Sequence, residues 1–262
     1  MKKRLDILLV ERGLAATREQ ARALIMAGSV TIKGEVFDKP GTKVDETAPL
    51  EVAAAPKYVS RGGNKLERAL DAFGIDVSGL VAVDIGASTG GFTDCLLKRG
   101  AARVYAVDVG YGQLDWRLRS DPRVIVMERT NARYLTSLPE PVDLATVDAS
   151  FISLRLIIPP VARLLSEGGR IVTLVKPQFE AGREQVGKGG VVRNPEVHRA
   201  VLRGLAEWGD GEGYGFQEVV ASPIRGPAGN VEFLALVVPG QRIATDIDAK
   251  IESALKEAEL LT

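Results

Sequence analysis

The segment 84–92, with the sequence DIGASTGGF, joins the end of one apolar run to the start of another. Glycines let a backbone turn tightly and approach a ligand closely, and the first turn of a helix offers unpaired amides. We therefore predict that this loop binds a cofactor through Asp84, Gly86, Ala87, Ser88, Gly90, Gly91 and Phe92. Taken alone, the loop is also compatible with a purely structural turn.

A carboxylate at the end of the next apolar segment indicates which kind of cofactor. Asp108 lies 22 residues after Gly86, where an acid commonly accepts hydrogen bonds from ribose hydroxyls. Ser88 replaces the second glycine of the dinucleotide pattern G-x-G-x-x-G, and no Walker lysine follows. We therefore predict S-adenosylmethionine, which has no pyrophosphate to cradle.

Charged residues at the ends of other apolar segments are candidates for the acceptor side of a methyl transfer. Asp148 begins the sequence DASF, placed like the Asn/Asp-Pro-Pro-Tyr segment of amino-group methyltransferases, but without the prolines, which counts against a base amine as target. Lys176 ends an apolar strand, where its charge is costly unless it finds partners or emerges into solvent. Glu232 begins an otherwise apolar strand, and Lys65 is predicted to lie just before a helix. Taken singly, each is also compatible with a surface charge.

These residues require elements that bring strand ends together. From residue 81 onward, apolar segments alternate with helical patterns, which is typical of a parallel α/β sheet. The predicted strands are 81–85, 104–108, 124–127, 144–148 and 171–176, followed by two apolar runs near 216–221 and 231–238 that suit an antiparallel pair. Residues 244–262 are predicted to form a charged surface helix.

The N-terminal residues form a different pattern, a small α-plus-hairpin unit. Thr17 and Gln20 make a capping box for a helix that ends at Gly28, and alternating apolar residues surround a turn at Gly34. The run AAAP at 53–56 has the composition of a linker. We place the domains at 1–55 and 61–262, with a linker at 56–60.

Charge and cysteine content exclude several classes of protein. The 34 Lys and Arg balance 34 Asp and Glu, which argues against a domain-wide basic excess. Residues 1–68 nevertheless hold 13 basic against 9 acidic residues. Cys95 is the single cysteine, so an intrachain disulfide and a multi-cysteine zinc site are excluded, and we predict no metal. Because no apolar run reaches the length of an export signal or a membrane span, we expect a cytoplasmic protein.

Taken together, the motifs resemble the TlyA (haemolysin A) family of rRNA 2′-O-methyltransferases, in which an S4-type RNA-binding module precedes an FtsJ-like domain. The segments that carry the resemblance are 60–66, 84–92, 108–114, 148–154, 175–180 and 226–233. The resemblance implies a Rossmann-like, class I S-adenosylmethionine-dependent methyltransferase sheet after a small α+β RNA-binding domain. It further implies transfer to ribose, with cytidine in 16S rRNA, 23S rRNA or both as target and the ribosomal subunits as partners.

By the same resemblance, Lys65, Asp148, Lys176 and Glu232 form the Lys-Asp-Lys-Glu tetrad of ribose methylation. A ribose hydroxyl is a weak nucleophile, so a base must take its proton as the methyl group is transferred. Lys176 is the candidate base, but an ordinary lysine is almost wholly protonated at pH 7. Lys176 could instead orient the 2′-oxygen, and the sequence leaves the choice open.

The S4-like unit supplies the predicted RNA contacts, which are Arg4, Arg18, Arg22 and Lys33. A solvated helix face explains any one of them equally well. Arg4-Leu5-Asp6 also resembles the catalytic tripeptide of pseudouridine synthases, but it lies inside the S4-like pattern.

Two alternatives to the enzyme are a membrane-active haemolysin and a non-catalytic rRNA-binding assembly factor. The lack of an amphipathic pore segment argues against the first, and the tetrad and glycine loop argue against the second.

Three minor features complete the expectations. His198, the sole histidine, is predicted to be a surface residue rather than a metal ligand. Residues 187–190, with the sequence GKGG, are predicted to form a mobile loop over the substrate. Cys95 is expected to be a small buried residue.

Overall fold

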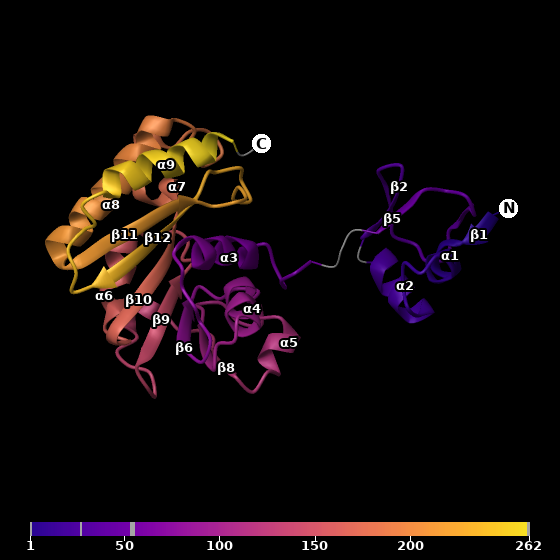
Figure 1. Cartoon of the computed structure of the whole chain (residues 1–262), viewed down its shortest axis with the longest axis horizontal. Helices are drawn as coiled ribbons and strands as arrows, with labels where there is room; N and C mark the ends of the chain where they lie inside the picture. The colour runs from indigo at the N-terminus through magenta and orange to yellow at the C-terminus, as the bar shows by residue number, and fades with distance from the viewer. Residues whose placement is uncertain (1, 27, 53–55, 261–262) are drawn as a thin grey trace. The chain divides into compact units, whose positions relative to one another are not determined.

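The computed structural model describes residues 2–26, 28–52 and 56–260, and Figure 1 shows the course of the chain. The chain divides into two compact units, Met1–Lys57 and Tyr58–Thr262. Residues 53–55 of the predicted linker run lie outside the described residues.

The first unit packs two helices against short antiparallel strands. Its elements are β1 (Lys2–Arg4), α1 (Leu5–Glu11), α2 (Arg18–Met26), β2 (Val30–Ile32), β3 (Glu35–Phe37), β4 (Lys43–Asp45) and β5 (Leu50–Val52). β1 pairs with β4, and β2 lies between β3 and β5. One half of the predicted capping box forms, because Gln20 N donates to Thr17 Oγ1, whereas the Gln20 side chain reaches one residue further back and accepts from Ala16 N. Leu5, Leu9 and Ile25 form the centre of the core.

The second unit is a seven-stranded sheet in the order β11-β12-β10-β9-β6-β7-β8. Its strands are β6 (Val81–Ile85), β7 (Arg103–Val107), β8 (Val124–Met127), β9 (Val142–Val147), β10 (Leu165–Val175), β11 (Tyr214–Ala221) and β12 (Phe233–Pro239). β6 to β10 are parallel, whereas β12 runs antiparallel to both β10 and β11. The predicted α/β class and the terminal antiparallel pair are therefore confirmed.

Helices cover both faces of this sheet. They are α3 (Gly62–Ala72), α4 (Gly91–Lys98), α5 (Trp116–Arg119), α6 (Leu154–Ala162), α7 (Pro177–Glu180), α8 (Pro195–Glu212) and α9 (Ile247–Glu259), with 3-10 turns η1 (Ala132–Tyr134) and η2 (Arg183–Gln185). One core cluster joins the sheet to α3, α4 and α5, and the other joins it to α6, α8 and α9. Both faces are buried, as the near-continuous apolar strands require.

The strand order reverses direction at β6, because the next strand in sequence, β7, lies on one side and β9 on the other. A ligand in an open α/β sheet binds beyond the carboxyl ends of the strands at this switch point. The glycine loop follows β6 and Asp148 follows β9. The topology therefore brings the predicted cofactor loop and the predicted acceptor residue Asp148 to the same edge of the sheet.

Two element boundaries differ from the predictions. β10 begins at Leu165 rather than 171, with a register irregularity between Leu165 and Arg170. Residues 166–170 are Ser, Glu, Gly, Gly and Arg, so no apolar run marks the first part of this strand. Lys65 lies inside α3 rather than before it, because the helix begins at Gly62, a residue of low helix propensity.

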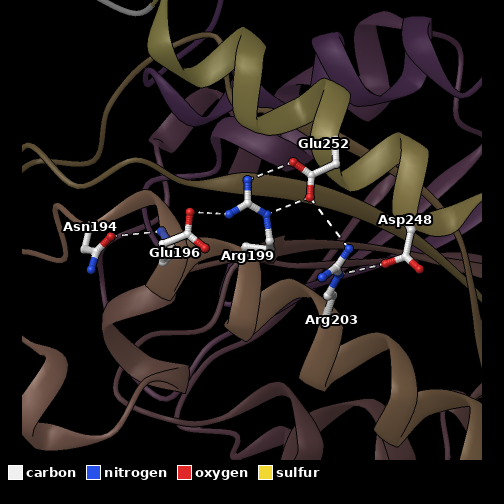
Figure 2. A network of polar contacts seen from close by, with 6 residues as sticks. All are labelled: Asn194, Glu196, Arg199, Arg203, Asp248 and Glu252. Carbon is white, nitrogen blue, oxygen red and sulfur yellow. Dashed lines mark hydrogen bonds and ion pairs between the residues drawn. The ribbon is translucent and has the colours of Figure 1, made fainter.

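The predicted C-terminal surface helix is α9, and it is amphipathic rather than merely exposed. Ile251 and Leu255 are buried in the core. Ion pairs join α9 to α8, as Figure 2 shows: Arg199 makes two contacts of 2.6 and 2.8 Å with Glu252, and Arg203 lies 2.7 Å from Asp248.

This network generates a prediction about salt. Replacing Glu252 by glutamine removes the carboxylate that both Arg199 and Arg203 approach, so the urea midpoint of unfolding should fall at low ionic strength. The difference from wild type should shrink in 1 M salt, where the Debye length is about 3 Å. Asp248→Asn is the matched control, because Asp248 is more exposed and has one arginine partner here; an equal effect of both variants would contradict the central role of Glu252.

Candidate active site

The glycine loop touches the end of β9. Gly86 has a φ of +82°, and a Cβ atom at this position would lie 2.5 Å from the carbonyl oxygen of Asp148. The amides of Gly86 and Ala87 both donate to Val107 O at the end of β7, and Asp148 N donates to Ile85 O. The ends of β6, β7 and β9 are therefore fixed to one another through a position that only glycine can occupy without strain.

Asp84 holds this loop from behind. Its side chain is buried and accepts hydrogen bonds from Thr93 Oγ1 at 2.7 Å and from Thr146 Oγ1 at 3.0 Å. Burial raises the pKa of Asp84 to about 7, and the nearby charge of Asp148 acts in the same direction. The carboxyl group thus points into the protein, which makes Asp84 a support for the loop rather than a residue of the cavity wall.

A cavity of about 200 Å³ opens beside the loop. Its wall holds most of the predicted cofactor residues and two of the predicted tetrad, namely Lys65, Gly86, Ala87, Ser88, Gly91, Phe92 and Asp148. The wall also holds five residues that we did not predict as site residues, namely Ser60, Arg61, Gly62, Thr89 and Pro227. The first three belong to segment 60–66, one of those that carry the family resemblance. Gly90 faces away, since a Cβ atom there would meet Leu118 and Leu114.

Asp108 lines a much smaller cavity of about 10 Å³ with Gly110, Gln113 and Glu128. Its carboxylate accepts from Ser88 N at 2.8 Å and from Gly110 N at 2.6 Å. Ala87 and Ser88 belong to the walls of both cavities. The two predicted cofactor elements, the glycine loop and the acid after β7, therefore border adjoining spaces.

The four predicted tetrad residues form two ion pairs. Lys65 Nζ lies 2.5 Å from Glu232 Oε2, and both side chains are buried. Lys176 Nζ lies 2.6 Å from Asp148 Oδ1 and donates to Ser150 Oγ at 2.8 Å. Because Lys65 and Asp148 line the same cavity, each pair contributes a residue to its wall.

Glu232 is positioned by the segment that precedes β12. A Cβ atom on Gly226 would lie 2.5 Å from Glu232 Oε1, so the loop backbone closes against the carboxylate. Asn230, also buried, accepts from Val192 N and donates to Gly190 O. These two bonds tie the base of the GKGG loop to the Glu232 segment, while a covering role of that loop over the substrate stays a prediction.

His198 corrects one expectation. It is buried rather than on the surface, with Nε2 3.1 Å from Val192 O and its ring edge-on to Phe233. Burial lowers the pKa of its imidazole. The sequence pattern of α8 allowed His198 to lie on either the exposed or the buried face of the helix. In the structure, its packing against Phe233 of β12 places it on the buried face. Cys95 is buried, as expected.

The described residues place limits on other kinds of site. Among them, no group of three or more His, Cys, Asp or Glu side chains is arranged to hold a metal ion. Within the same part of the chain, no helix has both the length and the apolar content to span a bilayer.

A seven-stranded sheet with an antiparallel final pair, a glycine loop after its first strand and an acid after its second defines a methyltransferase of the Rossmann-like class. The comparisons with known proteins refine this class. A model of the FtsJ-like methyltransferase family matches residues 58–237, and a model of the S4 domain matches residues 3–48. The chain belongs to the FtsJ-like methyltransferases that carry an N-terminal S4 domain, the TlyA (haemolysin A) family.

Individual relatives agree with this assignment. The chain is 51% identical over 234 residues to the 16S/23S rRNA (cytidine-2′-O)-methyltransferase TlyA of Mycobacterium tuberculosis, covering 88% of this chain and 87% of that one. It is 55% identical over 240 residues to Bacillus subtilis YqxC, provisionally named an rRNA methyltransferase, with 89% and 84% covered. A solved structure from Streptococcus thermophilus with a provisional haemolysin name has a TM-score of 0.77 at 45% identity, covering 98% and 96%.

The raised pKa of Asp84 predicts an unusual pH dependence of stability. The pKa is about 7 in the folded protein against an ordinary 3.8, so between these values the folded state binds more protons than the unfolded chain. Stability therefore falls as the pH rises from about 4 to about 7. Asp84→Asn removes this titration, and its free energy of unfolding relative to wild type should increase across the same window in urea titrations.

Asp121→Asn serves as the control for this measurement. The side-chain hydrogen bonds from Arg123 lower the pKa of Asp121, so this carboxylate contributes stability that is lost as the pH falls. This loss occurs below about pH 4, so the stability of Asp121→Asn relative to wild type should stay nearly flat between pH 4 and 7, where that of Asp84→Asn rises. A parallel response of both would refute the assignment to Asp84.

Proposed function

We propose that this protein transfers the methyl group of S-adenosylmethionine to the 2′-oxygen of a cytidine ribose in ribosomal RNA. The observation that carries the proposal is the pairing of Lys65 with Glu232 and of Lys176 with Asp148 beside a glycine-loop cavity. The names of the relatives support cytidine as the target and both 16S and 23S rRNA as candidate substrates.

The residues fit S-adenosylmethionine as the cofactor. The glycine loop offers backbone at close range, and the Asp108 carboxylate, held by two amides, has lone pairs left for ribose hydroxyls. Bound in this way, the cofactor supplies an electrophilic methyl group. Gly86, Ala87, Ser88, Gly91 and Phe92 would hold it, while Asp84 and Gly90 support the loop from outside the cavity.

The tetrad has two separate tasks. Lys176 faces the acceptor hydroxyl, where its amine takes the proton or orients the 2′-oxygen, and Asp148 keeps the amine in place. Lys65 stands on the cavity wall with its charge balanced by Glu232. A buried ion pair of this kind contributes little net stability, but removal of one partner leaves an uncompensated buried charge. We infer that the pair is needed for position rather than for stability.

The S4 domain supports an RNA substrate. Asp6 is fully buried and accepts from Arg4 Nε and Nη2 at 3.0 Å and from Arg18 Nε at 2.9 Å. Mainly through the bonds of Arg4, the two arginines lower the pKa of Asp6 to about 2. Asp6 is thus ionised at neutral pH and holds two exposed guanidinium groups together, an arrangement that suits phosphate recognition. Because the carboxylate is buried between these groups, it is poorly placed for the pseudouridine synthase role.

Arg22 and Lys33 complete the proposed RNA contacts. Both are exposed, and Lys33 has a φ of +52° in the turn between β2 and β3. Ribosomal subunits are accordingly the proposed partners, and a ribosomal substrate agrees with the expected cytoplasmic location.

The function is tested by mapping 2′-O-methyl groups in rRNA incubated with S-adenosylmethionine and either the wild-type protein or Lys176→Ala. The substitution should lower the rate of transfer by about a hundredfold or more, because it removes the amine that faces the acceptor. Affinity for S-adenosylmethionine, measured by calorimetry, should stay within about twofold, since Lys176 is absent from both cavity walls.

Asp108→Ala is the complementary control. It removes the proposed ribose acceptor and should weaken cofactor binding by about tenfold or more. The proposed reaction would be refuted if Lys176→Ala transferred the methyl group at the wild-type rate, or if the wild-type protein did not methylate rRNA.

The arginine pair predicts a change in the salt dependence of RNA binding. Arg18→Gln should weaken binding to ribosomal subunits and reduce the slope of log affinity against log salt by about one, as expected for one lost phosphate contact. Lys3→Gln is the matched control, because Lys3 alternates to the opposite face of β1 from Arg4 and pairs with Glu11. An equal loss in slope for both variants would contradict a specific role for Arg18.

A further inference from the structure

Lys176 has two oxygen partners in the described part of the chain, and both come from the segment between β9 and α6. Asp148 Oδ1 lies 2.6 Å from Nζ, yet this oxygen has no partner with hydrogen-bond geometry. Ser150 Oγ, at 2.8 Å, accepts a hydrogen bond from the same nitrogen. The contact with Asp148 is therefore an ion pair, and the contact with Ser150 is a directed bond.

The two contacts constrain the amine in different ways. The attraction between two charges depends mainly on their separation, whereas a hydrogen bond weakens steeply when its angle departs from linear. Asp148 thus holds Nζ at its place, and Ser150 determines how the nitrogen is rotated. The Nζ nitrogen is tetrahedral. One of its four directions is the bond to Cε, one points to Ser150 Oγ and one points towards Asp148, so a single direction remains. That direction holds an N–H bond in the ammonium form and the lone pair in the neutral amine.

Glu180 connects the two segments that meet where Ser150 contacts Lys176. This residue lies in α7, which begins directly after Lys176. Its carboxylate accepts from Leu154 N and from Ser153 Oγ, each at 2.7 Å, at the start of α6. Phe151, next to Ser150, has a φ of +62°, a conformation that a bulky residue keeps only when its surroundings impose it. The segment is therefore held in a defined shape against the Lys176 strand end.

We propose that Ser150 is a positioning residue for methyl transfer, whose hydroxyl sets the direction in which Lys176 Nζ faces the acceptor hydroxyl. This proposal rests on the proposed function for the identity of the acceptor. Its structural content, an oriented amine, is independent of the substrate. A serine hydroxyl suits this task because it accepts from either charge state of the amine without adding a second carboxylate beside Asp148.

The first test compares steady-state methylation of ribosomal subunits by wild type, Ser150→Ala and Ser150→Thr at saturating S-adenosylmethionine. Ser150→Ala should lower kcat by about tenfold, the order of a lost hydrogen bond to a charged group. KM for the subunits should stay within about twofold, because Ser150 acts through Lys176 rather than on RNA affinity. Ser150→Thr keeps the hydroxyl and should recover most of kcat.

Ser153→Ala is the matched control for the shape of the segment. It removes a hydroxyl that donates to Glu180 instead of accepting from Lys176, and the bond from Leu154 N to Glu180 stays to hold the segment, so its loss of kcat should be clearly smaller than that of Ser150→Ala. A kcat for Ser150→Ala within twofold of wild type would overturn the proposal. So would an equal loss in Ser153→Ala, or a failure of threonine to restore kcat, because either would assign the effect to the shape of the loop.

A second measurement needs no RNA and separates this proposal from the proposed function. In protein with ¹⁵N-labelled lysine at mildly acidic pH, the Lys176 ammonium signal is assigned by its absence in Lys176→Met. Its proton exchange with water should be several-fold faster in Ser150→Ala than in wild type or Ser153→Ala, because a hydrogen bond that retards exchange is lost. Unchanged exchange would overturn the role of Ser150. Faster exchange in a protein that fails to methylate rRNA would leave the role standing and refute the reaction.

Discussion

The contact between Gly86 and the carbonyl of Asp148 is the constraint on which the site depends. A side chain at residue 86 would occupy the space of that carbonyl oxygen. Because the loop meets the strand end directly, the proposed cofactor side and the proposed acceptor side share one backbone contact. In the proposed reaction the methyl donor and the hydroxyl group that receives it must lie within bonding reach, and this contact limits how far apart the two sides can be.

The other half of the tetrad is built from residues that are remote in sequence. Lys65 and Glu232 are 167 positions apart, and they meet because α3 packs beside the sheet to which β12 is added next to β10. Their charges are withdrawn from water together, so neither is tolerated there without the other. The same logic applies in the S4 domain, where buried Asp6 is accompanied by two arginines.

Much of this architecture could be predicted from residue patterns. Alternating apolar strands and helices predicted the sheet, which the structure confirms, and the glycine loop with Asp108 predicted a cofactor side, which stays a proposal. The pairing of Lys65 with Glu232 was available only through family resemblance, because no local pattern connects two such distant charges. Local patterns also missed the start of β10, where residues 166–170 form no apolar run, and the start of α3 at Gly62, a residue of low helix propensity. Burial of His198 depends on which face of α8 meets β12, a tertiary fact. Likewise, nothing in the run DASF separates the outward Phe151 from the Ser150 that bonds Lys176.

The distance in sequence between Lys65 and Glu232 has a consequence for synthesis of the chain. The S4 domain, with its arginine pair, is complete once residue 52 has been made, long before the second half of the tetrad exists. Lys65 then has no carboxylate partner until residue 232 is synthesised and β12 joins the sheet. An unfinished chain can therefore have its S4 domain complete while the proposed site for methyl transfer still lacks Glu232.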